Sequence, residues 1–229
     1  MLKTRKRKTV RELVSGKPHS DGRENFARTF DVSRETLDRL TVYADMLAKW
    51  QRRINLVGPA TIEVLWTRHF ADSLELGQHA PSGSKTWLDI GTGAGFPGMV
   101  IATCGQQKNL QVNLVEANVR KCAFLREVTR RIKAPVTIHN RRIEAIDSQA
   151  IQTMAPDVVT ARALAPLDLL LKLAQKPLEY GAVGVFPRGQ DVEDELTSST
   201  KCWKMEAEIV ERNFGLPGKV LVVHRCARK

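Results

Sequence analysis

Apolar residues recur at helical spacing in the first third of this chain and in short strand-like runs beyond it. Ser33 is a typical N-cap residue and opens the first helical pattern. A second helix is predicted to start at Thr61. The apolar positions of these two helices are Leu37, Leu40, Ala44, Leu47, Trp50 and Ile54, then Ile62, Leu65, Trp66, Phe70 and Leu74.

From Thr86 onward, apolar runs alternate with helical segments. Asn118 is expected to cap a helix that ends at Pro135, and another helix is predicted over 166–176. The last two strands are expected to form a hairpin around 213–218. This pattern predicts an α/β fold, a seven-stranded mostly parallel sheet with helices on both faces. The predicted strands are 86–90, 111–115, 136–139, 157–160, 181–186, 204–211 and 220–224.

The chain therefore divides into three parts. Residues 1–30 show no period and mix charges with Gly, Ser and Pro, which is typical of a disordered tail. Residues 31–84 form the predicted N-terminal helical extension. Residues 85–229 form the α/β domain.

A glycine-rich loop follows the first predicted strand. Asp89 precedes three glycines at alternate positions, Gly91, Gly93 and Gly95. Only glycine lets the backbone turn this sharply and leaves room for a ligand atom against the main chain. At the carboxyl end of the first strand of an α/β sheet, such a loop binds nucleotide-like cofactors.

Two cofactor classes fit this loop. Residues 93–98 satisfy the G-x-G-x-x-G pattern of dinucleotide-binding proteins. Residues 89–95 form Asp-x-Gly-x-Gly-x-Gly, which resembles the first motif of S-adenosylmethionine-dependent methyltransferases. Glu116 ends the next predicted strand, 21 residues after Gly95. A carboxylate there can accept hydrogen bonds from both ribose hydroxyls of an adenosine, so Glu116 fits either class.

Length and composition set outer bounds. The 229 residues suffice for one α/β domain with a modest extension, and 42% hydrophobic residues indicate an ordinary core. No apolar run approaches the roughly 20 residues that span a bilayer, and the N-terminus lacks the apolar segment of a secretory signal. We therefore expect no membrane association. Four widely spaced cysteines form no C-x-x-C pair, so we expect reduced thiols, no bound metal and a cytoplasmic location.

The net charge of +11 indicates the kind of partner. Residues 1–30 carry nine Lys and Arg against three acidic residues. A basic chain favours a polyanion through counterion release and long-range steering. The N-terminal tail is therefore a candidate tether for such a polyanion.

Several motifs together resemble one family, RsmG/GidB, over the chain from about Ser33 to the C-terminus. The resemblance implies a Rossmann-like class I methyltransferase fold for 85–229. It also implies methyl transfer from S-adenosyl-L-methionine to N7 of a guanine in 16S ribosomal RNA. The substrate would be naked RNA, the small ribosomal subunit or an assembly intermediate. The motifs are Asn55-Leu56-Val57, Trp66-x-Arg68-His69-Phe70-x-Asp72-Ser73-Leu74, the run from Leu88 to Gly98, and Arg162-Ala163 after the fourth predicted strand.

The same resemblance implies roles for individual residues. Gly91 and Phe96 would contact the cofactor, and Glu116 would take the ribose. Arg162 would lie near the methionine end or the guanine and position substrate and cofactor. The cofactor-binding residues implied by the family are Asp89, Gly91, Gly93, Gly95, Phe96, Glu116, Ile143, Glu144 and Arg162, with Ile143 and Glu144 bordering the adenine.

Two residues depart from the family pattern. Ala161 stands where the family usually has Ser, which removes any hydroxyl role there. Arg188 stands where the family usually has the Lys of a Lys-Gly pair. It keeps the charge, but a planar guanidinium does not reproduce an ammonium, so we expect a different local contact.

The implied chemistry needs no general base. N7 of guanine carries an in-plane lone pair and no proton, so placement of N7, methyl and sulfur remains the protein's task. His69 is the candidate base, and a hydrogen-bonded histidine that supports the sheet or orients Asp72 is the preferred interpretation. The residues expected to hold RNA around the cofactor are Arg68, His69, Arg120, Lys121, Arg141 and Arg188.

Two other functions fit parts of the sequence. A nicotinamide-dependent oxidoreductase could use the same glycine loop, but no second domain is left to shape a hydride acceptor. A catalytically inactive RNA-binding protein would not need the intact glycines, Glu116, Glu144 and Arg162. We expect a monomer, because no long exposed apolar face is evident.

Overall fold

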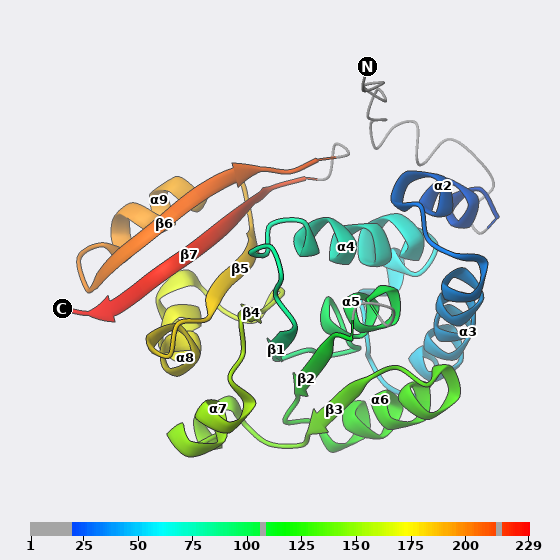
Figure 1. Cartoon of the computed structure of the whole chain (residues 1–229). Coiled ribbons are helices and arrows are strands. Elements are labelled where there is room, and N and C mark those ends of the chain that lie inside the picture. Colours follow the sequence, from blue (N-terminus) through cyan, green and yellow to red (C-terminus); the bar gives the residue numbers. More distant parts are fainter. Residues whose placement is uncertain (1–19, 106–108, 214–216) are drawn as a thin grey trace.

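The computed structural model describes residues 20–105, 109–213 and 217–229, and within these ranges the chain forms one seven-stranded sheet (Figure 1). The strand order is β3-β2-β1-β4-β5-β7-β6. β1 to β5 are parallel, and β7 runs antiparallel to both β5 and β6. The strands are β1 (Thr86–Ile90), β2 (Gln111–Val115), β3 (Val136–His139), β4 (Val158–Thr160), β5 (Val183–Arg188), β6 (Trp203–Glu211) and β7 (Lys219–Arg228).

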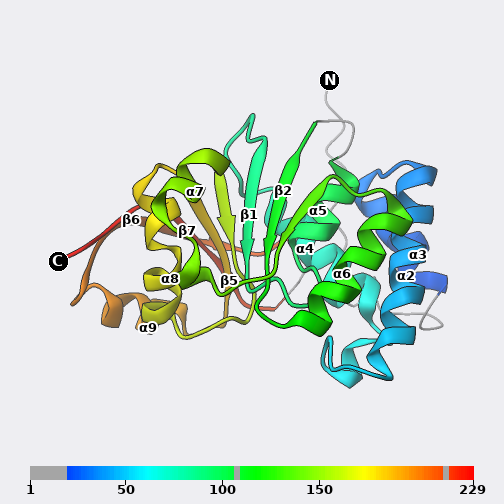
Figure 2. The same ribbon diagram turned by 90° about the horizontal axis from the view of Figure 1, so that it is seen from below.

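Helices cover both faces of this sheet, as Figure 2 shows. One face carries α3 (Arg34–Gln51), α4 (Asp72–Gly77), α5 (Gly98–Cys104) and α6 (Val119–Ile132), and α2 (Ser20–Phe30) packs outside them. The other face carries α7 (Ser148–Met154), α8 (Leu167–Glu179) and α9 (Val192–Ser199). The predicted Rossmann-like fold with a terminal hairpin is confirmed.

Alternate residues of the strands feed two separate cores. Trp87 and Val158 point to the core beneath α3 to α6, whereas Leu88 and Val159 point to the core beneath α7 and α8. Because successive side chains of a strand face opposite sides, strands between two helical layers are apolar at most successive positions. This double burial explains why the strands were visible in the sequence as continuous apolar runs.

The predicted helix caps are confirmed at two positions. The Ser33 hydroxyl accepts a hydrogen bond from the Thr36 amide at 3.1 Å, and Asn118 Oδ1 accepts from the amides of Arg120 and Lys121. Each side chain satisfies amides that a helix N-terminus otherwise leaves unpaired. α3 and α6 therefore begin where the sequence places them.

The tail prediction for residues 1–30 is wrong in its last third. Residues 20–30 form α2, and Phe26 is almost fully buried, with its ring 5.4 Å from that of Trp66 and 6.3 Å from that of Phe70. Tertiary contact with distant aromatic rings stabilises a segment whose local pattern is weak. Residues 1–19 lie outside the described ranges.

The helix predicted from Thr61 has a different form. Pro59–Thr61 is a 3₁₀ turn, Trp66–Ala71 is a π-helix and α4 begins only at Asp72. The sequence also missed α7 and α9, which are short. The expected hairpin turn falls partly on residues 214–216, outside the described ranges. None of the described helices is long and apolar enough to cross a bilayer.

Candidate active-site cavity

A cavity of about 820 Å³ opens at the carboxyl ends of β1 and β4. This is the point where the strand order reverses, and α/β proteins bind ligands there. Its walls come from several parts of the chain: residues 56–61, the π-helix, the glycine loop, α6, the segment after β4, and the ends of β5 and of the β6–β7 hairpin. Lining residues include Thr61, Arg68, His69, Asp72, Gly91, Gly93, Phe96, Lys121, Arg162, Arg188, Asp191, Arg212 and Gly218.

Asp89 holds the glycine loop from behind. Its carboxylate accepts hydrogen bonds from the Gly98 amide and the Thr160 hydroxyl, both at 3.0 Å, and from the Thr92 hydroxyl. Asp89 is fully buried, and burial raises its pKa to about 6 against the opposing effect of these donors. The Asp89 side chain faces the loop and not the cavity, so the geometry favours a role in shaping the loop over the expected contact with the cofactor.

The three glycines of the loop share a backbone conformation but differ in what a side chain would contact at each position. All have positive φ, 65° at Gly91, 61° at Gly93 and 101° at Gly95. A Cβ on Gly95 would lie 2.7 Å from the Tyr43 hydroxyl oxygen, so Gly95 faces α3. A Cβ on Gly93 would meet only the Gly91 carbonyl oxygen, at 3.9 Å. Gly91 and Gly93 line the cavity, and Gly95 lets the loop pack closely on the helical layer.

Glu116 lies beside this loop at the end of β2. Its carboxylate accepts from the Gly93 amide at 2.9 Å and from the Asn118 amide at 2.8 Å, one on each oxygen. A carboxylate oxygen accepts two hydrogen bonds, so each retains capacity for a ligand hydroxyl. Ile143 is half-buried and Glu144 is exposed on a 3₁₀ turn after β3, and neither lines the cavity.

Arg162 reaches into the cavity from the segment after β4. Its Nη1 donates to Asp72 Oδ2 at 2.8 Å and to the Arg68 carbonyl at 3.2 Å. Its Nη2 donates to His69 Nδ1, and its guanidinium carbon lies 5.0 Å from the centre of the Phe96 ring. The preceding Ala161 is buried in the core beneath α8, which explains why a methyl group suits that position.

His69 is a neutral hydrogen-bonding residue in this structure. Because Nδ1 accepts from Arg162, the ring proton belongs on Nε2, which lies 2.8 Å from the Thr61 hydroxyl oxygen. Burial, together with Arg162 and Arg68, lowers the pKa of His69 to about 3. The ring stacks on Phe96 at 4.7 Å and is almost fully buried. The RNA contact expected for His69 therefore has no support in this geometry, and the ring nitrogens contact Arg162 and Thr61 rather than Asp72.

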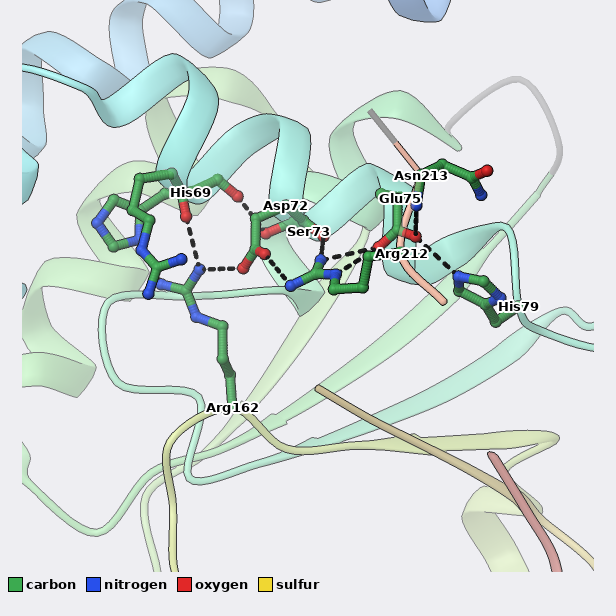
Figure 3. A network of polar contacts seen from close by, with 9 residues as sticks. His69, Asp72, Ser73, Glu75, His79, Arg162, Arg212 and Asn213 are labelled. Atoms are coloured by element: carbon green, nitrogen blue, oxygen red, sulfur yellow. Dashed lines mark hydrogen bonds and ion pairs between the residues drawn. The ribbon is translucent and has the colours of Figure 1, made fainter. Parts of the chain in front are cut away.

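Behind Arg162 lies a network of ion pairs that the sequence did not reveal (Figure 3). Arg212, just beyond β6, pairs with Asp72 Oδ1 through Nη1 at 2.6 Å and with Glu75 Oε2 through Nη2 at 2.8 Å. Glu75 also accepts from the Asn213 amide and contacts His79 Nε2. Burial works to raise the pKa of Glu75, but His79 and Arg212 hold it below its ordinary value.

Four of the predicted RNA-binding residues are at least partly exposed, whereas Arg188 is paired within the protein. Arg68 is exposed and Lys121 half-buried at the cavity, and Arg120 and Arg141 are exposed outside it. Arg188 instead forms a bidentate pair with Glu195 and donates to the Ala165 carbonyl at 3.0 Å. Its charge is therefore neutralised within the protein, which argues against the predicted phosphate contact.

Comparisons with known proteins agree with this geometry. Residues 36–219 match the family model described as rRNA small subunit methyltransferase G. A protein of Paramagnetospirillum magneticum named ribosomal RNA small subunit methyltransferase G is 47% identical over 90% of this chain and 97% of its own length. A protein of the same name from Methylobacterium radiotolerans is 46% identical over 86% of this chain and 91% of its own length.

Solved structures with lower identity share the fold. The cofactor-bound Rv0187 structure from MTB has a TM-score of 0.54 at 16% identity, covering 92% of this chain and 98% of that one. A mutant of MtNAS in complex with S-adenosylmethionine has a TM-score of 0.51 at 15% identity, covering 95% of this chain and 90% of that one. At such identities the likeness concerns the architecture alone.

Proposed function

This chain belongs to the rRNA small subunit methyltransferase G family, and from that premise we propose that it transfers a methyl group from S-adenosylmethionine to N7 of a guanine in 16S ribosomal RNA. The observation that carries the proposal is the meeting of the glycine loop and Arg162 in one cavity at the sheet's switch point. Neither the oxidoreductase nor the inactive RNA-binding alternative has comparable support.

The residues present fit S-adenosylmethionine. Gly93 leaves open space above the loop, and both oxygens of Glu116 retain capacity for ribose hydroxyls. Ile143 and Glu144 remain the proposed border of the adenine. When bound, the cofactor supplies an electrophilic methyl group on a sulfonium. Every other requirement of the reaction concerns how the protein holds the guanine.

The geometry supports direct transfer without a general base. His69 uses Nδ1 to accept from Arg162, and its Nε2 carries the proton, so His69 offers no free lone pair to the substrate. N7 already has its lone pair, and alignment alone can contribute at most about 7–11 kcal/mol to lowering the barrier. We propose that Arg162, held over Phe96, is the residue that aligns the guanine with the methyl donor.

The exposed cations around the cavity suit an RNA backbone. Arg68 and Lys121 line the cavity, and Arg120 and Arg141 extend the basic surface. N7 lies in the deep major groove of A-form RNA, which side chains cannot read, so the target guanine must lie in a loop or leave the stack. The naked RNA, the small subunit and an assembly intermediate all remain candidate substrates. We also propose a cytoplasmic monomer.

A direct assay tests this function. Purified protein is mixed with labelled S-adenosylmethionine and, in parallel reactions, with naked small-subunit RNA, small subunits and assembly intermediates from cells that lack the protein, and modified nucleosides are mapped by mass. We expect 7-methylguanosine at one position of the RNA in at least one of these substrates, and label on another atom, or no label in any of them, would contradict the proposal. In parallel, S-adenosylmethionine should raise the melting temperature and NAD should not.

The N-terminal tether is tested separately. Because α2 packs on the core, the deletion must end before residue 20. We expect removal of residues 2–19 to weaken RNA binding while cofactor affinity stays the same. Equal RNA affinity with and without these residues would refute the tether.

A further inference from the structure

Arg212 is fully engaged in ion pairs, yet it comes from a hairpin far along the chain from every motif of the site. Its side chain is only 3% exposed although it borders the cavity, so no part of it is free to hold a substrate. Nη1 pairs with Asp72, whereas Nε and Nη2 both donate to Glu75. Nη2 also donates to the Asp72 carbonyl at 3.4 Å. Any effect of Arg212 on the reaction must therefore pass through Asp72 or Glu75.

Asp72 is shared between two arginines. Oδ2 accepts from Arg162 and Oδ1 pairs with Arg212, so each guanidinium has one oxygen (Figure 3). Guanidinium and carboxylate groups pair most strongly through two parallel hydrogen bonds, one to each oxygen. Arg162 does not make that arrangement. Arg212 Nη1 lies 2.6 Å from the second oxygen of Asp72 and fills the space beside it as an ion pair, although this contact lacks hydrogen-bond geometry. The Nη2 of Arg162 turns to His69 instead.

We propose that Arg212 is a positioning residue for Arg162. By occupying Asp72 Oδ1, it prevents Arg162 from closing into a two-oxygen pair with Asp72. Arg162 then remains spread between Asp72 and His69, with its flat face over Phe96. The end of the β6–β7 hairpin thereby controls the orientation of the guanidinium that faces the proposed guanine site. This inference rests on the proposed role of Arg162.

The charges of the network support this assignment. Two buried carboxylates, Asp72 and Glu75, balance two guanidinium groups, and each carboxylate contacts Arg212. A lysine at 212 would keep the charge, but one ammonium cannot reproduce the fork that contacts both carboxylates. Arg212→Lys therefore separates charge from geometry, and Asp72 Oδ1 would become available to Arg162.

The test is a double-mutant cycle on methyl transfer measured in single turnover at saturating S-adenosylmethionine. We expect R212K to slow transfer about tenfold in the wild-type background and less than twofold in the R162K background. The affinity for S-adenosylhomocysteine should change less than twofold. R225K is the matched control, because Arg225 lies exposed on β7 with only a 3.8 Å contact to Glu206.

The outcomes are distinguishable. Equal slowing in both backgrounds, or no slowing in either, would overturn the positioning role of Arg212. If R162K itself transfers methyl groups at the wild-type rate, the proposed role of Arg162 fails first. A structural effect alone would lower the melting temperature without the coupling. The ¹⁵N chemical shift of His69 Nδ1 gives a second readout, since it should change in R212K and not in R225K. If R212K does not fold, E75Q loosens the same arginine from its other end and takes its place in the cycle.

Discussion

The glycine loop and the arginine network meet at one cavity, yet they are built in opposite ways. Two of the three donors to Asp89, Thr92 and Gly98, lie within nine residues of it along the chain, and only Thr160 lies far away, at 71 residues. The network joins Asp72 to Arg162 across 90 residues and Glu75 to Arg212 across 137. The loop uses backbone conformation and amides, whereas the network uses charged side chains from segments that only the folded sheet brings together.

This difference has consequences for how each region fails. A buried ion pair that loses one partner leaves an uncompensated charge, and that loss is expensive. A side chain that does not tolerate the φ angle of the loop distorts the backbone there, but it removes no charged group. The network should therefore be more sensitive to a neutral substitution, and the loop more sensitive to an added Cβ.

The largest effect is expected from Asp72→Asn. This change leaves Arg162 and Arg212 without the charge between them, and breaking a buried pair of this kind costs about 3–5 kcal/mol of folding free energy. Urea unfolding of the free protein measures it. Asp45→Asn on the exposed face of α3 is the control. A cost below that of a surface substitution would mean that the network carries little stability.

The next effect comes from the loop and compares two of its own glycines. Gly95→Ala places a Cβ 2.7 Å from the Tyr43 hydroxyl at φ 101°, and we expect a loss of about 2–3 kcal/mol. Gly93→Ala has space and should cost only about 1 kcal/mol through its positive φ. Thermal and urea unfolding of both variants give the ratio. Equal losses would show that steric fit on α3 is not what requires Gly95.

A smaller effect is expected for Glu116→Gln. The amide offers one oxygen where the carboxylate offers two, so either the Gly93 or the Asn118 amide loses its acceptor. We expect S-adenosylmethionine to bind about tenfold more weakly, measured by calorimetry, because the ribose contact and the loop both weaken. Unchanged affinity would remove Glu116 from the proposed site.

Two of the arginines that line the cavity, Arg68 and Arg188, should differ modestly in their contribution to RNA binding. Arg68 is exposed, so Arg68→Ala should weaken binding severalfold and reduce the salt slope by about 1. Arg188 is neutralised by Glu195, so the paired change Arg188→Met with Glu195→Met should leave the salt slope unchanged. Filter binding across a salt series measures both. A reduced slope in the Arg188 and Glu195 double variant would restore Arg188 as a phosphate contact.

The smallest expected effect is of pH on the transfer step. The pKa of His69 is lowered to about 3, so His69 stays neutral from pH 6.5 to 9 and nothing is gained by deprotonating it there. We expect the single-turnover rate to be flat across this range. A tenfold fall per pH unit below a pKa near 7 would indicate a general base and contradict base-free transfer.

Two predictions from sequence lack support in the geometry for a common reason. Arg188 and His69 were expected to hold RNA, but Arg188 pairs with Glu195 and His69 accepts a hydrogen bond from Arg162. A side chain's charge is visible in the sequence, whereas its partner depends on which segments meet. Glu195 lies only seven residues from Arg188 and was a usable signal, but Arg212 had no neighbour that pointed to Asp72.

The sequence by itself determined the features that depend on local chemistry. The strands, the caps at Ser33 and Asn118 and the glycine loop follow from backbone preferences and from burial on both sheet faces, which leave their mark at short range. The packing of α2, the buried state of Asp89 and the sharing of Asp72 by two arginines depended on folding. Each requires groups far apart in the chain to exclude water from one another, and the energy of that contact belongs to no single segment.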